Sequence, residues 1–132
     1  MNVKAVKIEL RELKRTVHII DTMKATQERY IMRIEALSKM VQTPRIVAQI
    51  ESLKTMLSLM ELDYYIEKAT SIEKKYIPAI NALEQTEKAI ILDSFINGLP
   101  YWKIGLSFGY AEVTVRKKAD SALRKIAKAI ED

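Results

Sequence analysis

The 132-residue chain contains no cysteine, only three glycines and three prolines, and a single histidine. Without cysteine, it can form neither disulfides nor thiolate metal sites, which fits a cytoplasmic protein. No apolar run approaches the roughly 20 residues that a membrane span needs, so no membrane association is expected. The scarcity of glycine and proline, beside many Lys, Glu, Ile, Leu and Met residues, predicts an almost entirely helical, all-α chain.

Groups that carry catalysis are equally sparse. His18, the only histidine, lies in a helical stretch beside Val17 and Ile19, where we expect a satisfied structural role rather than a general base. Glu61 and Asp63 are two residues apart, so they do not share a helix face and cannot act as a carboxylate pair. Since there is also no glycine-rich phosphate loop, we expect no enzyme, no cofactor and no metal.

Basic residues are in excess, and the net charge is +5. Between Lys103 and Ile130, only Glu112 and Asp120 are acidic, against seven basic residues: Lys103, Arg116, Lys117, Lys118, Arg124, Lys125 and Lys128. A basic excess concentrated on one helix is an electrostatic footprint for phosphate. The alternative is a solvated lysine face, which by itself is the commoner explanation of such a run.

The N-terminal half predicts two long helices. Residues 3–42 contain no glycine or proline and repeat apolar residues at steps of three and four, which marks one face of a long helix. Thr43 and Pro44 suit the cap and the first position of a second helix, whose apolar stripe covers residues 46–64. Because the connection is short, the two helices are expected to form an antiparallel, coiled-coil-like hairpin.

Two such helices cannot bury both apolar stripes by pairing with each other alone. Packing against another copy, or against the C-terminal part of the chain, would cover the remainder. We interpret residues 1–77 as a hairpin that forms a homo-oligomer, expected to be a dimer. The open alternative is that this hairpin is only the core-forming half of a monomer.

Proline marks the boundary between two predicted domains. Pro78 predicts a kink or break near Ile77. The chain then divides into residues 1–82, which form the hairpin, and residues 83–132. Asn81 and Thr86 both suit the cap of the next helix, and the sequence does not decide between them.

All three glycines fall within twelve residues, at positions 98, 105 and 109. Glycine is placed where a backbone turns sharply or approaches another segment closely. Gly98 and Gly109 separate three predicted helices, over residues 84–96, over 100–108, and from 112 to the end of the chain, and Gly105 lies within the second. Two short helical segments followed by a basic helix have the layout of a DNA-binding helix-turn-helix.

Apolar spacing predicts how the last two helices pack. Ile104 and Phe108 share one face of the short helix, and Val115 faces them from the next helix. Gly105 lets the two helices cross closely, and Tyr110 packs on Val115 as a hydrophobic staple. The third helix then buries one stripe, formed by Val115, Ala119, Ala122, Leu123, Ile126 and Ile130.

The opposite face of the third helix is rich in hydrogen-bond donors, and Asp120 belongs to the same face. Near the N-terminal end, where base edges are reached, Arg116 and Lys117 can each pair with guanine. Val113 and Thr114 can touch a thymine methyl group. Farther along the helix, the basic side chains are better placed for phosphates; they are Arg124, Lys125 and Lys128.

Residues 83–126 resemble region 4 of sigma-70-type factors without a gap. The residues that carry this resemblance are Leu83, Glu87, Lys88, Ile90, Ile91, Ile104, Gly105, Gly109, Val115, Arg116, Ala122, Leu123, Arg124, Lys125 and Ile126. Arg116 is the best-matched base-reading position. Glu112 and Val113 depart from the family's polar or basic readers, so the resemblance implies no sigma-type promoter preference. Nothing resembles the other sigma regions, so a complete promoter-melting factor is not expected.

The order of hairpin and helix-turn-helix is similar to small phage transcriptional regulators of the ArpU and RinA kind. The resemblance implies a phage or prophage regulator that binds promoter or operator DNA, with contact to RNA polymerase as a further possibility. Two alternatives stay open. One is a small phage DNA-packaging subunit, and the other is a protein-interaction module that docks on RNA polymerase. Outward Val113 and Trp102 favour the latter, although Trp102 is expected to be a core or hairpin-docking residue.

Overall fold

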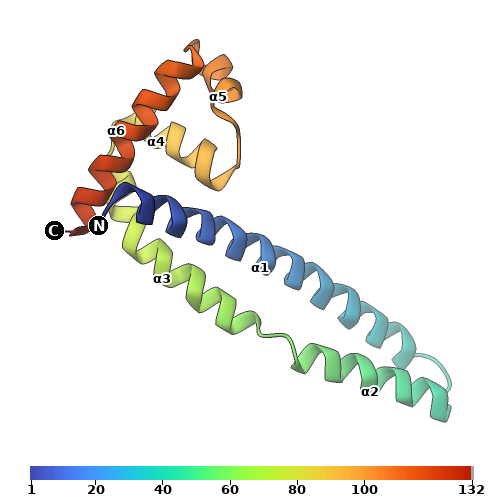
Figure 1. The fold of residues 1–132 in the computed structure, drawn as a ribbon. Coiled ribbons are helices and arrows are strands. Elements are labelled where there is room, and N and C mark those ends of the chain that lie inside the picture. The colour runs from blue at the N-terminus through green and yellow to red at the C-terminus, as the bar shows by residue number, and fades with distance from the viewer. Residues whose placement is uncertain (132) are drawn as a thin grey trace. The chain divides into compact units, whose positions relative to one another are not determined.

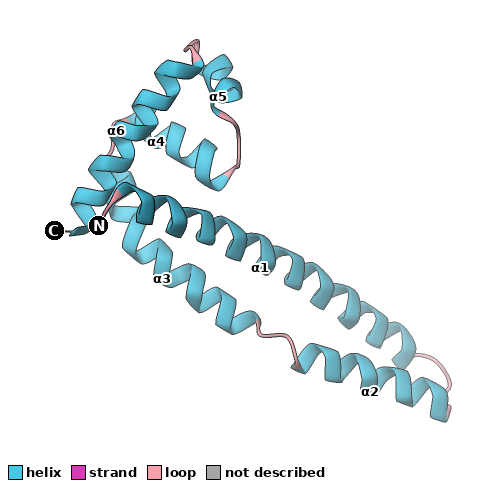
Figure 2. Ribbon diagram, in the orientation of Figure 1, coloured by secondary structure: helices cyan, strands magenta, loops and turns pink. Residues whose placement is uncertain are grey.

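The computed structural model describes residues 1–131, and within them the chain is built from helices and short connections without any strand (Figure 1, Figure 2). The all-α prediction is therefore confirmed. No helix among these residues is long and apolar enough to cross a membrane. The elements, in chain order, are α1 (Val3–Ser38), α2 (Pro44–Ser58), α3 (Leu62–Asn81), α4 (Gln85–Ile91), the π-helical turn η1 (Leu92–Ile96), α5 (Tyr101–Phe108) and α6 (Glu112–Glu131).

The chain folds into two compact units. Unit 1 combines Met1–Thr16 with the chain from Lys68 onward, and unit 2 comprises Val17–Glu67. The predicted division lies elsewhere, between residues 82 and 83. The difference arises because the first turns of α1 and the end of α3 share a core with the C-terminal helices, so that Val6 and Tyr76 pack with Leu123.

Unit 1 contains two clusters of buried side chains. The larger joins α1 and α3 to α4, η1 and α6, through Val6, Leu10, Tyr76, Ala79, Ile80, Ile91, Phe95, Ala122, Leu123, Ile126 and Ala127. The smaller joins α4, α5 and α6, through Ile90, Ile104, Val115 and Ala119. Helix α6 contributes to both clusters, so its buried side is packed along most of the length of the helix.

Unit 2 has a thin core. In residues 17–67, all of which the structure describes, the buried hydrophobic side chains are Ile20, Leu37 and Ile50. Helix α2 begins as predicted, because the Thr43 side chain accepts a hydrogen bond from the Ile46 backbone N–H and Pro44 occupies the first helical position.

The second long helix of the predicted hairpin is broken, which the sequence analysis did not predict. Residues 59–61 separate α2 from α3, although they include neither glycine nor proline. The Ser58 hydroxyl donates to the Thr55 carbonyl at 2.7 Å, a local bond of a kind that slightly weakens or bends a helix without ending it. The first turn of α3 then carries Asp63, whose negative charge favours a helix N-terminus.

Of the kink or break predicted near Ile77, the break is wrong, because α3 continues through Pro78 to Asn81. Proline removes one backbone donor, whose acceptor would be the carbonyl of Lys74. Lys74 is an exposed residue, so water can bind that carbonyl. The helix resumes its bonding beyond the proline, since the Ala82 N–H donates to the Pro78 carbonyl at 3.2 Å.

The C-terminal helices begin and end close to their predicted positions. Glu84 occupies the N-cap of α4 without a side-chain hydrogen bond, so neither Asn81 nor Thr86 caps this helix. The helical path continues through η1 to residue 96, as predicted, but its last turn is a π-helix. Gly98 then adopts a φ of +70°, in the left-handed region, as suits the sharp turn that the sequence predicts at a glycine.

Candidate nucleic-acid interface

A turn of three residues joins α5 to α6, and two glycines determine its geometry. Gly109 ends α5 with a φ of +72°, in the left-handed region that glycine adopts without strain. The Tyr110 backbone N–H donates to the Gly105 carbonyl at 2.9 Å. Gly105 is buried, and a Cβ at this position would collide with the Tyr110 carbonyl oxygen while touching Val115. The close approach predicted at Gly105 is therefore present, and the atom nearest to this position is the backbone carbonyl oxygen of Tyr110 in the turn.

The buried side of α6 agrees with the predicted stripe. Val115, Ala119, Ala122, Leu123 and Ile126 are fully buried, and Ile130 packs on the larger cluster as a partly buried side chain. Tyr110 packs against the cluster that contains Val115, as expected of a staple.

The prediction for Phe108 is wrong. Its side chain is 36 % exposed and lies outside both buried clusters. Its ring instead stacks on Tyr110, with centroids 6.0 Å apart and planes inclined by 13°. Phe108 is the last residue of α5, so the chain turns before its side chain can enter the core.

The predicted base-reading residues lie at the start of α6 and face solvent to different extents. Arg116 and Lys117 are exposed, and Val113 is 57 % exposed, whereas Thr114 is half-buried. The Arg116 guanidinium lies 3.3 Å from the Glu112 carboxylate one turn earlier. This ion pair is between exposed groups, which makes it weak, so it leaves the guanidinium able to exchange partners.

The residues predicted to contact phosphate differ in what they already bind. Lys128 and Arg124 are exposed, and Arg124 Nε donates to the backbone carbonyl of Asp120 at 3.3 Å. The Asp120 side chain is half-buried. Lys125 already forms an ion pair, because its ammonium lies 2.7 Å from the carboxylate of Glu87 on α4.

Glu87 and Lys125 form an interhelical ion pair that the sequence analysis missed. Glu87 is only 4 % exposed, yet it carries a charge that Lys125 offsets. The hydrogen bond to Glu87 is the main cause that raises the pKa of Lys125 above its ordinary value. The two residues are 38 positions apart, so no local pattern pairs them. Lys125 therefore ties α6 to α4, which adds a structural role to its predicted contact with phosphate.

A second set of contacts ties α1 to the same unit. Arg11 lies over the Phe95 ring, 5.8 Å from its centroid, in a cation–π contact. The Lys14 ammonium occupies the space next to the Cα of Gly98, where a Cβ would meet it. The N-terminal part of α1 thus borders the connection between η1 and α5.

Trp102 is not a core or hairpin-docking residue, contrary to expectation. Its side chain is 56 % exposed, and Leu106, one turn later on the same side of α5, is 75 % exposed. Both residues lie away from Ile104, whose side chain enters the core. Helix α5 therefore presents an apolar pair on its outer side.

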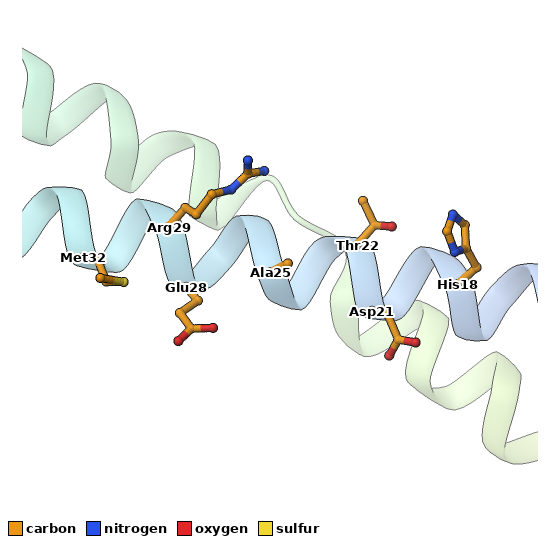
Figure 3. A pocket seen from close by; sticks show the side chains of 7 residues that line it. All are labelled: His18, Asp21, Thr22, Ala25, Glu28, Arg29 and Met32. Carbon is orange, nitrogen blue, oxygen red and sulfur yellow. The ribbon is translucent and has the colours of Figure 1, made fainter.

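His18 lies on the exposed side of α1, not in a satisfied structural position. Within unit 2, it lines a shallow groove with other side chains of the same helix (Figure 3): Asp21, Thr22, Ala25, Glu28, Arg29 and Met32. Among the side chains that the structure describes, no three of His, Asp or Glu are grouped to hold a metal ion. All seven lining residues belong to α1, so a single helix forms this groove.

No family model, no curated protein and no solved structure matches this chain.

Proposed function

We propose that the protein is a DNA-binding transcriptional regulator whose α6 enters the major groove of promoter or operator DNA. The observation that carries this proposal is the division of α6 between a fully buried apolar side and an exposed side with Arg116 and Lys117 near its start. A recognition helix needs this division, because one side docks on its own module and the other contacts bases. The α5–α6 pair would act as a helix-turn-helix.

The distribution of charge supports the proposal. Residues 17–67 contain six basic and seven acidic residues, so unit 2 has a net charge of −1. The rest of the chain holds sixteen basic and ten acidic residues and carries +6. The excess positive charge is thus confined to the unit that contains α6, where it would attract phosphate.

Control of transcription is the purpose that the sequence resemblance favours. The resemblance of residues 83–126 to sigma-70 region 4 implies promoter DNA, and the order of the parts is similar to phage late-gene activators. Contact with RNA polymerase would fit the same resemblance. Trp102 and Leu106 favour a protein partner specifically, because an exposed apolar pair of this kind is typical of a docking surface.

Unit 2 is proposed to hold two copies of the chain together. Nine large hydrophobic side chains are exposed in its 51 residues: Ile31, Met32, Met40, Val41, Val47, Met56, Leu59, Tyr64 and Ile66. A surface so apolar and nearly neutral can meet a second copy without strong charge repulsion. Sedimentation should give a dimer, whereas a ring of many copies would favour the DNA-packaging alternative.

Selection from a random-sequence duplex library tests the function. The intact protein should enrich one sequence, and its affinity for random duplex should fall steeply as salt rises. If the protein binds no duplex even at low salt, the DNA-binding function is refuted. A partner protein captured through Trp102 and Leu106 would then become the leading hypothesis.

A further inference from the structure

The first turns of α1 carry a row of basic residues that the predicted interface does not include. Lys4, Lys7, Arg11 and Lys14 follow one another at steps of three and four, which places them along one side of the helix. Lys4, Arg11 and Lys14 are exposed, and Lys7 is half-exposed. These four residues are called the α1 stripe below.

The acidic residues of the same segment point elsewhere. Glu9 lies 2.9 Å from the ammonium of Lys75, and Glu12 bonds to Lys68, so both carboxylates face α3. Burial pushes the pKa of Glu9 upward, but Lys75 and the Tyr76 hydroxyl outweigh it and hold this pKa below its ordinary value. The hydrogen bond from Lys68 likewise lowers the pKa of Glu12. Their negative charge is thus neutralised by α3, and the α1 stripe keeps its positive charge.

The position of this charge opposes helix stability. The N-terminus of a helix carries a partial positive charge and favours acidic residues in its first turn. The first turn of α1 has no acidic residue and instead contains Lys4, with Lys7 one turn later. Two lysines at this end of the helix lower the stability of α1 by itself, but a bound anion beside them would offset this charge repulsion.

The far end of the stripe lies beside the connection between η1 and α5. Arg11 contacts Phe95, and Lys14 borders Gly98, so the stripe ends beside the connection that leads into α5. In helix-turn-helix proteins, the helix that precedes the recognition helix crosses the DNA backbone. Over its length of about 15 Å, the stripe offers roughly one cation per helical turn, which suits a linear array of phosphates.

We infer that the α1 stripe is a second DNA-contacting surface, which binds the phosphate backbone beyond the segment bound by α5 and α6. This inference rests on the proposed DNA-binding function. It assigns α1 a role in unit 1 besides helix packing. Because the stripe would contact phosphates only, it should strengthen binding to every duplex and add no sequence preference.

A salt titration of the intact protein with Lys4→Gln and Lys7→Gln combined tests the inference. Each phosphate contact contributes about 0.9 to the slope of log affinity against log salt, so the slope should become shallower by roughly two. Affinity at low salt should fall equally for a selected and a random duplex. The matched control, Lys24→Gln with Lys39→Gln, removes the same charge from exposed positions of unit 2 and should leave the slope unchanged.

A variant that reverses the charge of Lys4 and Lys7 separates an effect on DNA binding from an effect on folding. Lys4→Glu with Lys7→Glu should raise the thermal stability of unit 1, because acidic residues suit a helix N-terminus, and should weaken DNA binding further. If the wild-type protein binds duplex and the glutamine variant keeps the wild-type slope, the stripe is refuted while the proposed function stands. If the wild-type protein shows no salt-sensitive duplex binding, both are refuted.

Discussion

Replacing Gly105 with alanine tests the packing that sets α6 on α5. The new Cβ would collide with the carbonyl oxygen of Tyr110 and lie 3.5 Å from a methyl carbon of Val115. The colliding atom belongs to the backbone, and the hydrogen bond from the Tyr110 N–H to the Gly105 carbonyl holds that turn in place, so the turn cannot move away at low cost. Overpacking of this kind costs about 1–3 kcal/mol, with the upper half of the range expected here.

The helix propensity of alanine works against this loss. Alanine is about 1 kcal/mol more favourable than glycine inside a helix, so the net destabilisation of the Gly105→Ala variant should be about 1–2 kcal/mol. For a chain of this size, the melting temperature should fall by roughly 3–10 °C. Calorimetry measures the shift, and the fluorescence of Trp102, the single tryptophan, reports whether α5 unfolds in the same transition.

Gly109 provides the matched control. No atom lies within 4 Å of a Cβ added there, but its φ of +72° disfavours alanine by about 1–2 kcal/mol. Asparagine tolerates this conformation better, so Gly109→Asn should be milder than Gly109→Ala, whereas no substitution rescues position 105. A rise in melting temperature for Gly105→Ala would refute the packing, because it is the behaviour of a glycine in an open helix.

Three further predictions follow from the ion pairs and the shared core. Lys125→Met should lower the melting temperature more than Lys117→Met, because it leaves the buried Glu87 carboxylate unpaired; equal effects would contradict the pair. The free energy of unfolding should fall as the pH drops below 4.5, the ordinary pKa of the carboxyl group, because the pKa of Glu12 is lowered in the folded state and the unfolded chain takes up protons first. In a series of thermal-unfolding measurements at different pH, the Glu12→Gln variant should lose less stability over this acid range than the wild type. A fragment of residues 83–132 should lose most of its helical circular dichroism, because it lacks the α1 and α3 side chains of the larger core; a fully folded fragment would instead support the predicted domain boundary.

Local patterns in the sequence were sufficient to predict where the C-terminal helices begin and end and which side of α6 is buried. Gly98 and Gly109 mark turns that require a positive φ, and the apolar spacing of α6 identifies the side that is buried. These features depend on residues within one or two helical turns of each other, so the spacing alone predicts them. The start of α2 at Pro44 follows from the same kind of local chemistry.

Features that depend on tertiary contacts could not be predicted in this way. Pro78 stays inside α3, and the carbonyl that loses its partner belongs to Lys74, whose exposure the sequence does not reveal. Glu87 resembles an ordinary surface residue until Lys125, 38 positions away, is found beside it. The packing of α1 against the C-terminal part of the chain was one of two alternatives that the sequence left open, because its partners follow after residue 67 and no local pattern selects them.

The break at residues 59–61 has a different origin. Ser58 and Thr55 form a local hydrogen bond that is compatible with either a continuous or an interrupted helix. The apolar stripe continues through Leu57 and Met60 to Tyr64, so periodicity alone favoured one helix. Leu59, the C-cap of α2, is 73 % exposed, so neither a strong breaker residue nor burial of this side chain accounts for the interruption.

The most direct test of the central claim is the ratio of affinities for a selected and a random duplex, measured for the wild-type protein and for Arg116→Ala with Lys117→Ala. The variant should lose the preference, by about 1–3 kcal/mol for each base contact removed, while its melting temperature stays near that of the wild type. Arg33→Ala with Lys39→Ala, which removes the same charge from exposed positions of unit 2, should keep the preference. An unchanged preference in the α6 variant would contradict the assignment of α6 as the recognition helix.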